Sequence, residues 1–370
     1  MKLEVQKYLE THTISDVVSE FGIAVRVYDD RYCFSYSMIK SPKMHPIVRE
    51  CRGLVLDSEF NVICRPFDRF FNYTEAPDIE KDFDISTSIA CEKIDGSLIK
   101  TYCYKGTWEA CTRGTAKGET ETQMGDLFRD LVLEAFQGDE QNFQDFCNEK
   151  LCTDVTYIFE LTSLSNKVVK FYNKFPEVWI LGARHSETGD YLSYEELDKV
   201  FENVDFVRKP KRFKFDTVEA ILESAKHLKD MDEGYVCWDI VSGIRVKIKS
   251  PTYVAIHRLK GEGVVNMKSA VQIILNGEEK EFLTYFPEYT DIFTTSKDFI
   301  DNTLKEVDEL YEKYKDIEVQ KDFALKVKDH AGSALMFVAR GKGLETASEA
   351  FYTLPDQKQI RFFVNRIKSD

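Results

Sequence analysis

The sequence predicts an α+β protein with a mixed N-terminal region over residues 1–254 and an all-helical C-terminal region over residues 255–370. Two observations lead to this prediction. Before residue 254, short segments alternate apolar and polar residues with the period of two that is typical of strands, and helical stretches lie between them. After residue 254, apolar residues recur at helical spacing, and in the segment 296–317 one face consists of Phe299, Ile300, Leu304, Val307, Leu310 and Tyr311.

The predicted elements of the N-terminal region alternate in type along the chain. They are a helix over 1–22, a β-rich segment over 24–73, three strands over 88–113, a helix over 119–150, strands at 155–164 and 177–185, helices that follow 193 and 216, and a hairpin over 233–250. Capping boxes at Ser193/Glu196 and Asp216/Glu219 predict where the last two helices begin. Ser242-Gly243 predicts a two-residue hairpin loop.

Composition and charge restrict the class of protein. Hydrophobic residues make up 43% and aromatic residues 13% of the chain, which is too much for a disordered protein. The formal net charge of -14 argues against a protein that coats nucleic acid through bulk charge. An acidic exterior can still surround a local basic cleft.

Cysteine usage and hydropathy indicate a soluble protein of the cytoplasm. The nine cysteines form no C-x-x-C pair and their number is odd, which favours a reducing compartment. The first ten residues carry charges and no apolar signal core. Since no segment approaches the ~20 apolar residues that span a bilayer, we expect no membrane partner.

The first chemical signal is Lys93-Ile94-Asp95-Gly96-Ser97, a lysine after a predicted strand that is followed by a turn pair. Such a lysine can project into a cleft, and Gly96 lets the backbone approach a nucleotide closely. An ordinary hairpin turn explains the same residues, and Lys-x-Asp-Gly arises by composition in roughly one chain in ten of this length. Alone, the motif is weak evidence for a nucleotide site.

The second signal is the segment 244–249, in which three apolar residues alternate with the cations Arg245, Lys247 and Lys249. In a strand, this alternation places the three cations on one face. Like charges so close together repel each other unless an anion such as a phosphate lies over them. A solvated outer face is the alternative interpretation.

Two carboxylates and an aromatic segment complete the set of signals. Glu160 stands within an apolar strand pattern and Glu233 opens the hairpin, where a charge is costly unless it is paired or functional. Core salt bridges would also explain them. Arg52 and the segment 65–73, "RPFDRFFNY", could offer cations and an aromatic platform, although in isolation core aromatics with a surface arginine explain them better.

The order of these signals is more specific than any one of them. A turn lysine, two carboxylates and then Lys-x-Lys resemble the covalent nucleotidyltransferase superfamily of ligases and RNA-capping enzymes, in which the lysine of K-x-D-G attacks a nucleotide α-phosphate. The flanking segments are similar to the bacteriophage RNA ligase 1 family. They are "FSY" at 34–36, "ECRG" at 50–53, "RPFDRFFN" at 65–72, "EKIDGSL" at 92–98, "ETGDYLSYEEL" at 187–197, "EGYV" at 233–236 and "VKIKSPTYVAIH" at 246–257.

The resemblance implies an N-terminal nucleotidyltransferase domain, 1–254, built on antiparallel sheets with flanking helices, and it assigns roles by position. Lys93 would be the nucleophile that carries AMP from ATP, and Glu233 would serve a divalent metal, Mg²⁺ or Mn²⁺. The nucleotide site would consist of Tyr36, Arg52, Arg69, Phe71, Lys93, Gly96, Arg113, Glu160, Lys247, Lys249 and Tyr253. The family often has lysine where Arg69 and Arg113 stand here, and a forked guanidinium contacts phosphate differently from an ammonium.

The implied activity is an ATP-dependent RNA ligase that joins RNA 3′-hydroxyl and 5′-phosphate ends through lysyl-AMP and RNA-adenylate intermediates. Its RNA partner would be a strand under repair, such as a tRNA cleaved in its anticodon loop. The helical region 255–370 would select RNA, and its basic residues could track phosphates or simply form solvated helix faces. These residues are Lys326, Lys328, Arg340, Lys342, Arg361, Arg366 and Lys368.

Two other functions remain open from the sequence. A DNA ligase or capping enzyme would usually carry a small β-barrel, the OB-fold, after the Lys-x-Lys strand, whereas this C-terminal region reads as helical. A non-catalytic RNA-binding protein on the same fold would be expected to have lost Lys93 or Lys247, and both are present.

Overall fold

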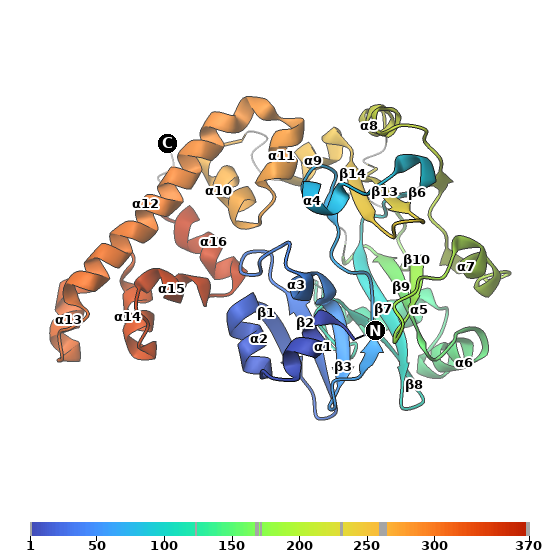
Figure 1. The fold of residues 1–370 in the computed structure, drawn as a ribbon, viewed down its shortest axis with the longest axis horizontal. Helices are drawn as coiled ribbons and strands as arrows, with labels where there is room; N and C mark the ends of the chain where they lie inside the picture. Colours follow the sequence, from blue (N-terminus) through green and yellow to red (C-terminus); the bar gives the residue numbers. More distant parts are fainter. Residues whose placement is uncertain are drawn as a thin grey trace. The chain divides into compact units, whose positions relative to one another are not determined.

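In a computed structural model, three β-sheets form the frame of the N-terminal region (Figure 1). The structure describes residues 2–122, 124–166, 170, 172–229, 232–258 and 265–367. By internal contacts the chain divides into two units, Met1–His257 and Arg258–Asp370, where the sequence placed a boundary at 254. The predicted fold class, α+β with largely antiparallel sheets followed by a helical region, is confirmed.

The first sheet is antiparallel with the strand order β1-β2-β3-β4. Its strands are β1 Ile23–Val27, β2 Arg31–Tyr36, β3 Arg52–Asp57 and β4 Val62–Cys64, and its helices are α1 Glu4–Leu9, α2 Ile14–Phe21 and α3 Pro46–Glu50. Val17 of α2 and Phe34 of β2 are fully buried in the core that the helices and sheet share. The helical segment expected over 1–22 is confirmed and consists of two helices, because the Thr13 side chain caps α2 and so starts a new helix after α1.

The second sheet has the order β11-β10-β9-β7-β8, and within this sheet the short pair β10 and β11 at one edge is parallel. Its strands are β7 Ser97–Tyr104, β8 Thr107–Thr112, β9 Val155–Thr162, β10 Glu177–His185 and β11 Val207–Arg208, and it packs on α5 Phe128–Ala135, α6 Glu140–Lys150 and α7 Tyr194–Val200. The helical stretch expected over 119–150 begins later than predicted, because the first helix in it, α5, starts at Phe128. Asp139 caps α6 and so separates it from α5.

The third sheet has the order β12-β6-β13-β14-β5. Its strands are β5 Phe71–Asn72, β6 Ser88–Glu92, β12 Arg212–Phe213, β13 Gly234–Asp239 and β14 Arg245–Lys249, and the accompanying helices are α4 Pro77–Glu80, η1 Ile85–Thr87, α8 Val218–Lys226 and α9 Pro251–Arg258. Strand β6 pairs with β13 and β12, whereas β7 pairs with β8 and β9. Residues 93–96 therefore cross from one sheet to another, and the interpretation of Asp95-Gly96 as a hairpin turn is wrong.

Three smaller predictions concerned two helix caps and one hairpin loop, and side-chain hydrogen bonds in the turns explain their outcomes. The capping box of Ser193 and Glu196 is confirmed at α7. The box expected at Asp216 is wrong, because Thr217 is the residue that caps α8. The two-residue loop between β13 and β14 is also wrong. Asp239 accepts hydrogen bonds from the Val241 amide and the Ser242 hydroxyl and so organises a longer turn.

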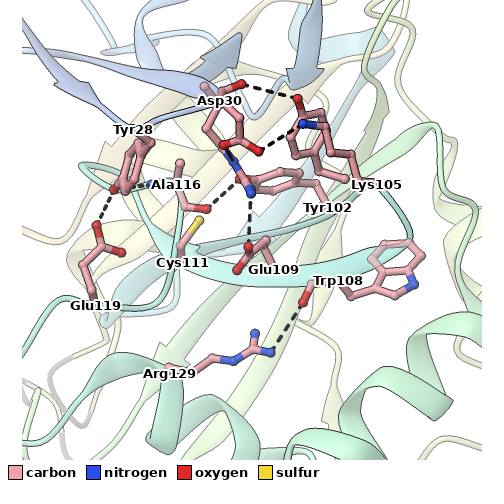
Figure 2. A network of polar contacts seen from close by, with 12 residues as sticks. Tyr28, Asp30, Tyr102, Lys105, Trp108, Glu109, Cys111, Ala116, Glu119 and Arg129 are labelled. Atoms are coloured by element: carbon pink, nitrogen blue, oxygen red, sulfur yellow. Dashed lines mark hydrogen bonds and ion pairs between the residues drawn. The ribbon is translucent and has the colours of Figure 1, made fainter. Parts of the chain in front are cut away.

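A polar network links the first sheet to the second (Figure 2). The Arg31 guanidinium donates to the Tyr102 hydroxyl at 3.2 Å and to Glu109 at 3.3 Å, and the Tyr102 hydroxyl donates to the Ala116 carbonyl at 2.6 Å. Burial raises the pKa of Glu109 while the charge of Arg31 opposes that rise. Since buried polar groups of this kind are costly to separate, the network fixes how the two sheets pack.

The C-terminal unit is built from helices alone within its described residues, 265–367. They are α10 Met267–Leu275, α11 Glu279–Tyr285, η2 Pro287–Tyr289, α12 Thr290–Tyr314, α13 Gln320–Val327, α14 Ser333–Lys342, α15 Ala347–Tyr352 and α16 Asp356–Val364. Four of the six residues predicted to face the core of α12 are buried, among them Ile300 and Val307. No helix in the described residues is long and apolar enough to cross a membrane. All nine cysteines of the chain are free thiols.

Two of the basic residues that could have tracked phosphates in this unit have structural partners. Arg340 donates to the carbonyls of Lys315 and Glu318, and Arg366 donates to the carbonyls of Phe362 and Ala331. These contacts satisfy carbonyls at helix ends and turns, so they favour the structural interpretation. Lys368 lies outside the described residues.

Candidate active site

Lys93 lies where β6 leaves the third sheet. Its backbone amide donates to the Gly234 carbonyl at 2.9 Å, and its Nζ contacts Glu233 Oε2 at 2.5 Å. The Lys93 side chain retains 21% of its exposure while Glu233 retains 5%. Two residues that are far apart in the sequence thus form a largely buried ion pair beside an open cavity.

This cavity, which we call the Lys93 cavity, has a volume of about 190 Å³. Both five-stranded sheets contribute to its walls. Six of the predicted site residues line it, namely Arg52, Lys93, Glu160, Glu233, Lys247 and Lys249. The structure therefore brings together residues that span most of the N-terminal unit.

The cations of β14 face this cavity as their alternation predicted. Val246 and Ile248 are fully buried on the opposite face, whereas Arg245, Lys247 and Lys249 line the cavity. Lys249 Nζ lies 3.6 Å from Glu233 Oε1, so one carboxylate lies between two ammonium groups. The interpretation of this strand face as a solvated outer surface is wrong.

Glu160 on β9 is the second carboxylate of the cavity. Burial raises its pKa to about 7, and the charge of Glu233 adds to the rise while that of Lys93 opposes it. The carboxyl therefore exchanges its proton near neutral pH instead of remaining fully ionised.

Three further predicted residues, Tyr36, Arg69 and Arg113, form a cluster with Arg52 in which the cations surround the Tyr36 ring. The guanidinium carbon of Arg69 lies 4.1 Å from the Tyr36 ring centroid, and that of Arg113 lies 4.8 Å away. Burial alone would raise the pKa of Tyr36, but the charges of Arg52, Arg113 and Arg69 bring it below its ordinary value. Because Arg52 also lines the Lys93 cavity, this cationic cluster adjoins it.

Asp95 anchors the loop after Lys93 to its surroundings. Its carboxylate accepts from the Tyr253 hydroxyl at 2.7 Å and from the Lys170 amide at 2.9 Å, and its own amide donates to the Tyr172 hydroxyl at 2.8 Å. Tyr253, predicted to contact nucleotide, does not line the Lys93 cavity. It is buried and holds this loop through its hydrogen bond to Asp95.

Two glycines permit the close packing that positions Lys93. A Cβ on Gly96 would lie 2.3 Å from the Leu161 carbonyl oxygen, so Gly96 is needed for close contact with β9. Gly234 has φ +138, and a Cβ there would lie 2.1 Å from the Ile248 carbonyl oxygen. Larger residues would push β9 or β14 away from the lysine.

Phe70 lines the cavity, and sequence reasoning chose its neighbour. The Phe70 ring centroid lies 4.7 Å from the guanidinium carbon of Arg52 and 5.4 Å from Lys247 Nζ. Phe71 is buried in β5 opposite Val246 and is absent from the lining. The alternation of β14 alone does not reveal this, because it shows that Val246 faces the core but not that Phe71 of β5 is the residue paired with it.

A divalent ion fits this site only in part. Among the described residues no group of three histidine, cysteine or carboxylate side chains could hold a metal. Glu233 already contacts Lys93 and Lys249, so it would share its oxygens with them. Magnesium needs few carboxylates when phosphate oxygens and water complete its shell, and Glu233 could supply one such ligand.

Comparisons with known proteins assign the chain to a family. The RNA ligase family profile matches residues 50–253, which is more than half of the chain. A putative bifunctional polynucleotide kinase/RNA ligase of Autographa californica nuclear polyhedrosis virus is 36% identical over 303 residues, which cover 78% of this chain and 42% of the viral protein. An RNA ligase of Rhodothermus phage RM378 is 25% identical and matches 85% of this chain and 86% of its own length.

The fold has a counterpart among solved structures. An archaeal ATP-dependent RNA ligase superposes with a TM-score of 0.50 and 13% identity, covering 97% of this chain and 82% of its own. At that identity the likeness concerns the fold alone. The chain spans less than half the length of the viral relative.

Proposed function

Since the chain belongs to the RNA ligase family, we propose that it is an ATP-dependent RNA ligase that forms a covalent lysyl-AMP intermediate on Lys93. The observation that carries this proposal is the position of Lys93 Nζ in a cavity that it shares with Lys247, Lys249 and the carboxylates of Glu160 and Glu233. An amine beside cations suits attack on a polyphosphate, because the cations attract the negatively charged phosphates to the amine.

The proposed reaction has three steps at one site. The neutral amine of Lys93 attacks the α-phosphorus of ATP, so that a P–N bond forms and the bond to pyrophosphate breaks. An RNA 5′-phosphate then attacks the same phosphorus, which forms a P–O–P link and releases Lys93. Finally the RNA 3′-hydroxyl attacks the 5′-phosphorus, joins the strand and expels AMP.

The residues around the cavity divide these tasks. Lys247 and Lys249 stabilise charge that develops at the α-phosphate, and Arg52 with the cluster around Tyr36 receives the departing pyrophosphate. A bound Mg²⁺ or Mn²⁺ would neutralise phosphate charge, with Glu233 as its protein ligand. Phe70 offers an apolar ring beside Arg52 and Lys247.

Partner and compartment are part of the same proposal. The substrate would be an RNA with 3′-hydroxyl and 5′-phosphate ends, such as a tRNA cleaved in its anticodon loop, and the helical unit from residue 255 onward would select it. The free cysteines suit the reducing cytoplasm. The described part of that unit contains helices and no barrel strands, which favours RNA ligase over DNA ligase or capping enzyme.

Label transfer from ATP tests the proposal. After incubation with α-labelled ATP and magnesium, the denatured protein should carry acid-labile label, and Lys93→Ala should carry none while it keeps the melting temperature of the wild type. Label on folded Lys93→Ala would place the nucleophile elsewhere. The absence of label on the wild type would favour a non-catalytic RNA-binding protein.

A further inference from the structure

A second cavity of about 530 Å³ adjoins the Lys93 cavity and shares Phe70 and Arg245 with it. We call it the arginine cavity, because four arginines contribute to its wall. Its lining includes Arg49, Arg69, Arg184, Arg245, Tyr191 and Trp238. None of the reaction steps above uses Arg49, Arg184 or Trp238.

Positive charge exceeds negative charge in this lining. Asp68 and Asp190 are its carboxylates, and Asp68 is occupied by Arg184 through hydrogen bonds of 2.9 and 3.2 Å. Within the described part of the chain, the other three arginines have no ion pair with a carboxylate. Arginines without a carboxylate partner that line one cavity, in a protein with a net charge of -14, indicate a binding site for an anion.

Three buried donors of this lining lack a hydrogen-bond partner among the described residues. They are Arg49 Nε, Arg69 Nη1 and Trp238 Nε1. Arg69 retains 4% and Trp238 8% of its exposure, so the surrounding protein shields both side chains from bulk water. Because a buried donor without a hydrogen-bond partner destabilises the folded protein, three in one lining point to an acceptor that binds there.

We propose that the arginine cavity binds a backbone phosphate of the RNA strand whose 5′ end is presented to Lys93. This inference rests on the proposed function. Phosphate oxygens supply the acceptors and the negative charge that the orphan donors and unpaired arginines require. Arg245 borders both cavities, so a strand can place one phosphate in each.

The shape of the arginine cavity favours a strand over the polyphosphate tail of ATP. It is larger than the Lys93 cavity, and its rim includes the exposed Val241, at 78%, and Ile240, at 52%. Arg245 lies over the rings of Tyr191 and Trp238, with its guanidinium carbon 3.9 and 4.4 Å from their centroids, so the two aromatic rings hold this cation in the wall that both cavities share. An RNA strand must enter the arginine cavity across this exposed rim, whereas a polyphosphate held by the Tyr36 cluster needs no such opening.

The test separates the first two reaction steps. Lysyl-AMP formation is measured against ATP concentration, and AMP transfer from the pre-adenylated protein is measured against a 5′-phosphorylated single-stranded RNA at several salt concentrations. The variants are Arg49→Gln and Trp238→Phe, which each remove an orphan donor. Arg26→Gln is the matched control, since Arg26 lies in β1 and contacts Glu119 outside both cavities.

Both variants should form lysyl-AMP at the wild-type ATP concentration dependence. For Arg49→Gln, the RNA concentration at half-maximal transfer should rise roughly tenfold, the effect of a lost charge-assisted hydrogen bond. Its logarithmic salt slope should become shallower by about 0.7, the value for one phosphate contact on a single strand. Trp238→Phe removes no charge, so it should weaken RNA binding and leave the slope unchanged.

Three outcomes would overturn the inference. A shift in ATP dependence or in pyrophosphate inhibition, with RNA transfer unchanged, would assign the cavity to the ATP tail. No shift in either step would show that it holds no phosphate. Failure of Arg49→Lys to restore the salt slope would leave Arg49 with a structural role. By contrast, wild-type protein that never forms lysyl-AMP contradicts the proposed function instead.

Discussion

Lys93 and Lys100 belong to one short stretch of sequence, yet their surroundings differ completely. Lys93 occupies the crossing between two sheets, with its amine on Glu233 and beside an open cavity. Lys100 lies within β7, is fully buried, and donates to the Gly53 carbonyl at 2.6 Å with Cys33 Sγ at 3.4 Å. The first amine can reach a ligand and the second cannot.

The difference shows what makes a lysine available for chemistry. A buried amine with a fixed carbonyl partner stabilises the fold, and moving it would leave that carbonyl unsatisfied. Lys93 instead pairs with a carboxylate that a second lysine also contacts, so a new anion can redistribute the charges. Lys100 serves the site indirectly, because Gly53 follows Arg52 in β3.

The largest expected effect separates the two lysines. Lys93→Arg should lower lysyl-AMP formation by more than about 10³-fold, because guanidinium stays protonated and cannot attack phosphorus. Lys100→Met should cost about 1–3 kcal/mol of unfolding free energy, because it removes the partner of the Gly53 carbonyl. The folded fraction of Lys100→Met should still take label from ATP. Comparable loss of label in both variants would mean that the contrast between them is wrong.

A substitution of Glu233, the ion-pair partner of Lys93, tests the comparison between Lys93 and Lys100 further. Glu233→Ala should reduce metal-dependent label transfer by about 10²-fold, because it removes the carboxylate that orders Lys93 and Lys249 and could hold the metal. Label transfer measured against magnesium concentration, together with melting temperature, checks this. Glu177→Ala is the matched control, since Glu177 pairs with Arg208 outside the Lys93 cavity. An unchanged magnesium dependence would assign Glu233 a structural role.

The last prediction concerns the pH dependence of stability and Glu160. Its pKa is about 7 in the folded protein, against 4.5 as the ordinary value, so between these values the folded state binds more protons. Stability from this group is therefore full below pH 4.5 and is lost as the pH rises through about 7. The stability of wild type relative to Glu160→Gln should fall by roughly 3 kcal/mol over that window. Urea midpoints of both proteins across the window measure this, and a constant difference would mean that Glu160 stays ionised when folded.

Much of the site could be predicted because its signals are local. Alternation in β14 places Lys247 and Lys249 on one face whatever packs above them, and the order of motifs singled out Lys93 and Glu233, which the structure brings into contact. The choice between Phe70 and Phe71 depended on how β5 pairs with β14, which no local pattern records. The orphan donors of Arg49 and Trp238 gave no sequence signal, since each residue is unremarkable until two distant elements meet.

By itself, the sequence determined the α+β class, the change to helices near residue 254, and the cationic face of β14, because period and capping are properties of neighbouring residues. Only the tertiary structure decided that β6 and β7 enter different sheets, which turned an apparent hairpin into a crossing loop with Lys93 at a cavity. The reason is physical. Strand partners are selected by long-range burial, and the same short segment can pair in several ways until the whole core is formed.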